Sequence, residues 1–188
     1  MSIICIKDIN IDDIIFTNKH KNKGGGEAVY VSYNNNSKFL LQTDKIYCIS
    51  GIIDNNYIEL ETNNTLFGDI ISSFESKIKT IYEDEENSLR SCITDNKIKL
   101  GIQNNNNFKT TIYSSDKKEL YSINDSIFLQ CLIQIAGIWF KNNEYGISWK
   151  LLQIKTYDKE LILDGYSFLD DGIDVHDVPV DEFKENMV

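Results

Sequence analysis

Two apolar stretches in the second half of the chain constrain the fold most. From Ile127 to Ile135 every second residue is apolar, and the run continues to Phe140. A polar segment, 141–146, separates it from a second run between Ile147 and Lys155. Apolar residues that recur with a period of two are typical of half-buried strands. The pair therefore predicts one long β-hairpin.

Shorter segments with strand character precede this hairpin, and a single stretch has helical spacing instead. We predict strands over 28–33, 38–43, 57–61, 97–102 and 108–113. The first two are separated by the turn-forming residues 34–37 and predict a second hairpin. From Leu66 to Tyr82 the apolar residues recur every three to four positions, and Thr65 precedes them as a candidate N-cap. This spacing predicts one α-helix inserted among strands.

The order of these elements predicts a mainly β fold. Sequential strands, one helix in the middle and a final long hairpin suit a small five-stranded barrel of the OB type with an inserted helix. A β-sandwich is the competing architecture. Periodicity alone does not separate the two.

The charge of the chain is unevenly distributed and predicts two parts. The net charge of the whole chain is −10, yet residues 157–188 hold ten acidic side chains and two lysines, a net of −8. So many like charges with few apolar residues do not offset the entropy of ordering the chain. We therefore predict a folded domain over 1–160 and a flexible, disordered acidic tail over 161–188.

No motif of enzyme chemistry or of metal binding is recognisable. The chain has two histidines, His20 in a lysine-rich stretch and His176 in the acidic tail, and four cysteines without metal-ligand spacing. Glycines 24–26 are not followed by the Gly-Lys-Ser/Thr of a phosphate loop. We expect no catalytic residue, no metal and no cofactor. Scattered cysteines without a signal peptide or membrane helix predict an intracellular protein that does not associate with membranes.

The side chains expected on the outer face of the strands combine aromatic rings with lysines. If the odd positions of 127–135 face the core and this parity continues, Trp139 points inward and Phe140 outward, and Lys150 faces solvent. The predicted DNA-binding residues are Tyr30, Lys38, Phe140, Lys141, Lys150 and Lys155. Lysines that neutralise phosphates beside rings that stack on bases are typical of single-stranded nucleic-acid binding, at about 1–3 kcal/mol per stacked base. Exposed aromatics can also simply pack on the helix, and we interpret both tryptophans as core residues.

The acidic total does not exclude DNA as a ligand, because the excess negative charge lies in the tail. A flexible polyanion tethered to a lysine-bearing domain competes with DNA for the same surface at millimolar effective concentration. Once DNA displaces it, the tail is free to bind partner proteins. The residues assigned to this role are Asp170, Asp171, Asp174, Asp177, Asp181, Glu182 and Phe183.

Two blocks of sequence resemble a known family. The segment QIAGIWFKNNEYGISWKLLQIK, from Gln134 to Lys155, and the segment VYVSYNNNSKFLLQTDKIYCISGI, from Val29 to Ile52, look like the recognisable blocks of a single-stranded DNA-binding protein family of large nucleocytoplasmic DNA viruses. That family is similar to the acidic-tailed OB-fold proteins of short-tailed phages. The phage tails finish on an aromatic residue, whereas Phe183 is internal in this chain.

The resemblance implies sequence-independent binding of single-stranded DNA in viral replication, recombination and repair. It implies that the acidic tail contacts replication or recombination proteins, and it allows a homodimer. The expected location is a viral factory in the host cytoplasm or the nucleus, with packaging in the virion as a further option. The alternative function is a viral structural or protein-interaction β-domain that binds no nucleic acid. A third, a small hydrolase, requires a deep pocket with a perturbed titratable group.

Overall fold

The computed structural model describes residues 2–22, 25–34, 39–54, 56–84, 86–105 and 108–157. The predictions made for Lys38 and for the acidic tail lie outside the described residues. So does most of the turn that was expected to join the first two strands.

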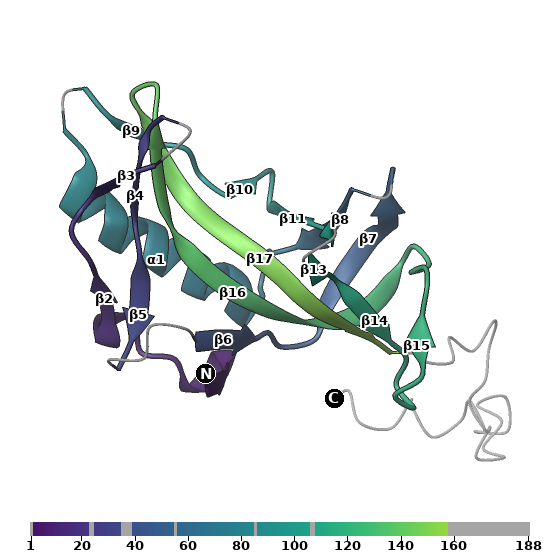
Figure 1. The fold of residues 1–188 in the computed structure, drawn as a ribbon. Helices are drawn as coiled ribbons and strands as arrows, with labels where there is room; N and C mark the ends of the chain where they lie inside the picture. The colour runs from purple at the N-terminus through teal and green to yellow at the C-terminus, as the bar shows by residue number, and fades with distance from the viewer. Residues whose placement is uncertain are drawn as a thin grey trace, which may run out of the picture.

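A long hairpin forms the centre of the molecule, as the alternating pattern predicts. Strand β16 (Ile127–Lys141) pairs antiparallel with β17 (Glu144–Thr156), and both curve across the whole structure (Figure 1). Asn142 and Asn143 join them with φ angles of 54° and 61°. Two successive residues with positive φ form the kind of turn whose twist matches that of the flanking strands, and asparagine tolerates this conformation well.

The other strands assemble along the two edges of this hairpin. The order of the main sheet is β10 (Ile93–Thr94), β11 (Lys97–Gly101), β8 (Tyr57–Glu61), β7 (Ile46–Ile53), β16, β17, β14 (Thr111–Tyr113) and β15 (Glu119–Leu120). Strand β16 is long enough to pair successively with β7, β6 (Phe39–Gln42) and β4 (Glu27–Val29) along one edge. Its other edge pairs with β17, which also takes β14 and β9 (Ser88–Leu89) in parallel.

Short elements complete the N-terminal third and the asparagine-rich loop. Strand β1 (Ser2–Cys5) runs parallel to β6, and β3 (His20–Lys21) pairs with β4. Two separate ribbons form from β2 (Ile14–Phe16) with β5 (Val31–Tyr33) and from β12 (Asn104–Asn105) with β13 (Phe108–Lys109). Two 3-10 turns, Ile6–Asp8 and Ile11–Asp13, connect β1 to β2.

The mainly β class with one inserted helix is confirmed. Among the described strands, the hydrogen-bonded path runs from β10 to β15 without returning to its first strand, so no closed barrel is present in this part of the chain. The hairpin expected between 28–33 and 38–43 is wrong. The first segment is split at Tyr30, so that β4 pairs with β16 and β5 with β2, while β6 pairs with β1 and β16. Both β4 and β6 form their backbone hydrogen bonds with the long strand β16 instead of with each other.

The helix α1 (Leu66–Tyr82) lies where its spacing predicts and packs one face onto the core. The hydroxyl of Thr65 accepts a hydrogen bond from the backbone N–H of Gly68 at 3.0 Å, which confirms the N-cap. Phe67, Ile71, Phe74 and Ile78 are fully buried. The helix lies at the same end of the molecule as β2 to β5 and the hairpin turn (Figure 1).

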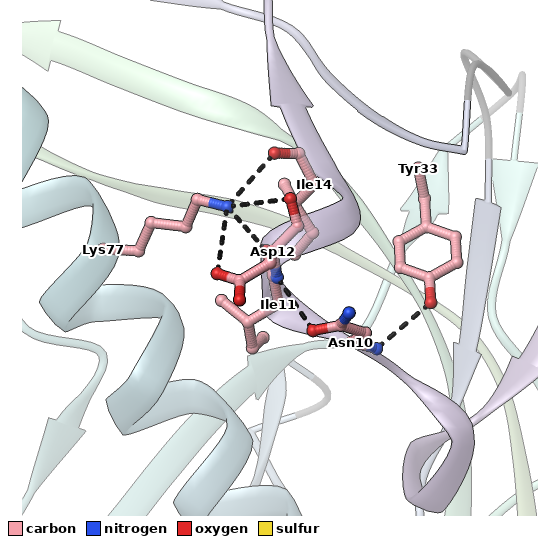
Figure 2. A network of polar contacts seen from close by, with 6 residues as sticks. All are labelled: Asn10, Ile11, Asp12, Ile14, Tyr33 and Lys77. Carbon is pink, nitrogen blue, oxygen red and sulfur yellow. Dashed lines mark hydrogen bonds and ion pairs between the residues drawn. The ribbon is translucent and has the colours of Figure 1, made fainter.

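A lysine of the helix fastens the N-terminal segment to it. The ammonium of Lys77 donates to the backbone carbonyls of Ile11, Asp12 and Ile14 at 2.7, 3.3 and 3.4 Å (Figure 2). In the same segment the backbone N–H of Asn10 donates to the hydroxyl of Tyr33 at 3.1 Å. The N-terminal residues are therefore fixed by polar contacts as well as by β1 and β2.

Two register shifts in the central hairpin change which side chains face the core. Between Ile135 and Gly137 strand β16 carries one extra residue, and opposite Leu132–Ile133 strand β17 carries another, Leu152. A bulge of this kind reverses the in–out parity of everything that follows it. After the first bulge, Ile138 and Phe140 are buried instead of Trp139, which is half-buried. The prediction that Phe140 points outward is therefore wrong; its side chain is 6% exposed.

Candidate nucleic-acid interface

The outer face of the hairpin carries glutamines and lysines in opposing positions. Gln130 pairs with Lys155, and Gln134 pairs with Lys150. The bulge at Leu152 matters here, because strict alternation from Lys150 would point Lys155 toward the core. With the extra residue, Ile154 is fully buried, and Gln153 and Lys155 take the outer side. Two of the sequence-predicted lysines are thus brought onto one face.

A groove of about 500 Å³ lies on this face, between the β1–β6 edge and the turn that follows β14. We call it the sheet groove. It is lined by Ile3, Gln42, Tyr113, Ser114, Lys117, Gln130, Cys131, Leu132, Gln153, Ile154 and Lys155. Residues more than one hundred positions apart therefore meet here, because β1, β6, β16, β17 and β14 are successive neighbours.

The lysines on this face have no carboxylate partner among the residues that the structure describes. Neither Lys117, Lys150 nor Lys155 forms an ion pair with any residue that the structure describes. The nearby carboxylate of Asp116 is occupied by Lys118 at 2.6 Å. Hydrogen bonds from Lys118 and Ser114 hold the pKa of Asp116 down at about 2, so this group stays ionised and paired at neutral pH.

The polar groups on the groove floor are held in place. Gln130 donates its side-chain amide to the carbonyl of Thr43 at 3.0 Å and accepts a hydrogen bond from the hydroxyl of Tyr157. The hydroxyl of Thr43 in turn accepts from the backbone N–H of Cys131 at 2.9 Å. Amide side chains oriented in this way hydrogen-bond to a ligand without adding charge.

Other predicted residues lie elsewhere. Tyr30 is exposed, at 55%, as expected, but it lies against His20, with ring centres 5.6 Å apart, toward the turn end of the hairpin. Lys141 is exposed at the turn itself. Phe140 is buried there against Tyr145, and the ammonium of Lys19 covers its ring at 4.2 Å from the centre. These three residues do not line the sheet groove, and neither does Lys150, which lies farther along the outer face of β17.

Both tryptophans are half-buried rather than fully inside. The indole N–H of Trp149 donates to the sulfur of Cys92 at 3.2 Å, and Trp139 lies against the Cα of Gly146, where a Cβ would meet its ring at 2.8 Å. Burial raises the pKa of the Cys92 thiol to about 11, so this sulfur is a neutral packing group at physiological pH.

Sequence reasoning missed Tyr113, Lys117, Lys45 and Tyr157 at or beside the groove. If the bulge at Leu152 is known, alternation from Gln153 through Lys155 places Tyr157 on the outer face. Without the bulge, alternation from Lys150 places it on the inner face. Lys117 and Tyr113 belong to a strand and turn that pair with β17 in parallel, and parallel pairing leaves no local sequence signal.

Within the described ranges, no three His, Cys, Asp or Glu side chains are grouped so that they could hold a metal ion. Of the helices in the same ranges, none has the length and apolarity needed to cross a membrane. Comparisons with protein-family models, curated proteins and solved structures found no match to this chain. The resemblance drawn from the two sequence blocks therefore stays a prediction.

Proposed function

We propose that the chain binds single-stranded DNA without sequence preference through the sheet groove. The observation that carries the proposal is a set of lysines with no carboxylate partner among the described residues. Lys117 and Lys155 line the groove with Tyr113 and several glutamines, and Lys150 lies farther along the outer face of the hairpin. Phosphate neutralisation by such lysines supplies most of the affinity for nucleic acid and does not depend on sequence.

The composition of the groove favours an unpaired strand over a duplex. Tyr113 and Leu132 offer apolar area between the lysines, and unpaired bases can pack on such surfaces whereas stacked duplex bases cannot. No element projects from this face as a helix would into a major groove, in the part of the chain that the structure describes.

The type of fold, the role of the acidic tail and the biological process are part of the same proposal. The described strands do not close into a barrel, but the contact between β11 and β17, which are not paired, supports a partly open arrangement of the OB type. The acidic tail competes with DNA for the lysines and, when displaced, binds replication or recombination proteins. The net charge of −8 over residues 157–188, which include the tail, supports this role. A function in viral DNA replication, recombination and repair rests on the sequence resemblance.

The test is a titration of labelled single-stranded and duplex oligonucleotides at several salt concentrations. Wild-type protein is compared with Lys150→Ala and Lys155→Ala, and with Lys97→Ala on β11 as the matched surface control. Lys150→Ala and Lys155→Ala should each flatten the plot of log affinity against log salt by about 0.7 per lost phosphate contact, and the control should not.

A wild-type chain that binds no single strand at low salt would refute the proposal, provided that a chain without residues 158–188 also fails. That result would instead favour the alternative of a protein-interaction domain. Equal slopes for all variants would show that DNA binds elsewhere on the molecule.

A further inference from the structure

Tyr157 lies at one border of the sheet groove and is held there by its neighbours. Its backbone N–H donates to the carbonyl of Phe128 at 2.9 Å, which continues the ladder of the central hairpin by one residue. Its hydroxyl donates to the side-chain carbonyl of Gln130, whose amide is fixed by the carbonyl of Thr43. The ring therefore has a defined orientation without any ligand.

Two ammonium groups cover this ring. The nitrogen of Lys45 lies 4.4 Å from the ring centre and that of Lys155 lies 5.0 Å from it. Neither lysine forms an ion pair with a carboxylate of the described residues. The attraction of a cation to an exposed ring is weak compared with its attraction to a phosphate at the same distance. Both lysines can therefore leave the ring of Tyr157 when a phosphate comes within reach.

More aromatic area continues from this point. Phe128 is 47% exposed and packs edge-to-face on Tyr47, with ring centres 5.5 Å apart. Phe128 and Gln130 are alternate residues of β16, so the rings extend the outer face beyond the end of the groove. A DNA strand that leaves the groove at this end therefore meets further aromatic rings beyond Tyr157.

We propose that Tyr157 is the base-stacking platform of the groove, and that Lys45 and Lys155 occupy its ring only while DNA is absent. A nucleobase takes the ring face, and the two ammonium groups move to the phosphates on either side of that nucleotide. Stacking and phosphate neutralisation are thereby coupled at one position. This inference rests on the proposed function and assigns the residue that contacts a base.

The first experiment compares Tyr157→Leu and Tyr157→Phe with wild type on an ordinary single strand and on an abasic one of equal length. Tyr157→Leu should bind the ordinary strand about tenfold more weakly, the amount of one lost stacked base, whereas Tyr157→Phe should bind within about twofold of wild type. On the abasic strand wild type and Tyr157→Leu should bind equally. Tyr121→Leu, which removes an exposed ring that also has a lysine over it but does not line the sheet groove, is the matched control and should change nothing.

The second experiment measures the wild-type chain and uses two conservative variants only to assign resonances. Lysine ammonium groups are ¹³C-dimethylated, which retains their charge, and the resonances of Lys45 and Lys155 are assigned with Lys45→Arg and Lys155→Arg. In the free protein both should be shifted upfield by the ring, and a saturating oligonucleotide should remove this shift.

The outcomes separate the two proposals. Absence of oligonucleotide binding by wild type would refute the proposed function itself. Two results would overturn the role of Tyr157 but not the proposed function. One is normal binding by wild type while the lysine resonances stay shifted by the ring. The other is binding by Tyr157→Leu as tight as that of wild type on both the ordinary and the abasic strand.

Discussion

A Cβ on Gly137 would lie 2.4 Å from the backbone carbonyl oxygen of Val29. Gly137 has a φ of 156° and ends the bulge after Ile135. The close approach lets β4 pair with β16 just beyond the bulge, where Val29 lies opposite Ile138. The same bulge places Phe140 in the core. The close pairing of β4 and the change of parity therefore occur at the same place in β16, beside Gly137.

Gly137→Ala should destabilise the fold by about 1–3 kcal/mol, the usual cost of overpacking a rigid site. The obstacle is a backbone oxygen, which cannot move aside as a flexible side chain can. Gly101→Ala on β11 is the control, since the atom closest to its Cβ would be 3.7 Å away, on the side chain of Gln103. Urea unfolding measures both variants. Equal stabilities would show that β4 can shift away from β16 at little cost.

Lys77→Met should cost about 1–3 kcal/mol, because it retains the length of the side chain but removes three charge-assisted hydrogen bonds to backbone carbonyls (Figure 2). Lys79→Met on the same helix removes only an exposed ion pair with Glu83 at 3.5 Å and should cost no more than about 0.5 kcal/mol. Hydrogen exchange of residues 10–16 should accelerate in the first variant alone. Unchanged exchange there would mean that β2 is held by packing.

Stability should fall as the pH rises from about 8.5, where an unfolded thiol ionises, to about 11. Burial raises the pKa of Cys92, so the unfolded chain loses this proton first and becomes favoured as pH increases. The slope from one such thiol is at most about 1.4 kcal/mol per pH unit. Cys92→Ala should flatten the measured slope. A slope identical in the two proteins would contradict the burial of this thiol.

Replacing Asp170, Asp171 and Asp174 by Asn should raise the affinity for single-stranded DNA by about three- to tenfold at low salt, and less at high salt. Three fewer charges weaken the tethered competitor for the groove lysines. The three substitutions leave the length of the chain unchanged, so an effect reports charge rather than truncation. Fluorescence anisotropy of a labelled oligonucleotide provides the measurement. Unaltered or lower affinity would exclude competition by the acidic tail.

Local patterns predicted the elements whose partners are near in sequence. The helix from Leu66 to Tyr82 and its cap at Thr65 follow from apolar spacing and one hydroxyl. The hairpin of β16 and β17 follows from alternation around two asparagines that adopt positive φ. In both cases the residues that stabilise the element lie within or beside it.

The candidate site depended on features that no short pattern contains. Lys150 was correctly expected to be exposed, yet Phe140 was assigned to the wrong side because alternation was carried through the bulge before Gly137. Tyr113 and Lys117 join the groove through parallel pairing with β17, across about forty residues of chain.

By itself the sequence determined that this chain is mainly β with one helix, that its longest strands form a hairpin, and that its acidic charge is concentrated at one end. These properties depend on period and composition, which are local. Only the tertiary structure decided which lysines meet the glutamines and rings on one face. A bulge reverses the side that every later residue takes, and the choice among distant strand partners follows from packing of the whole sheet.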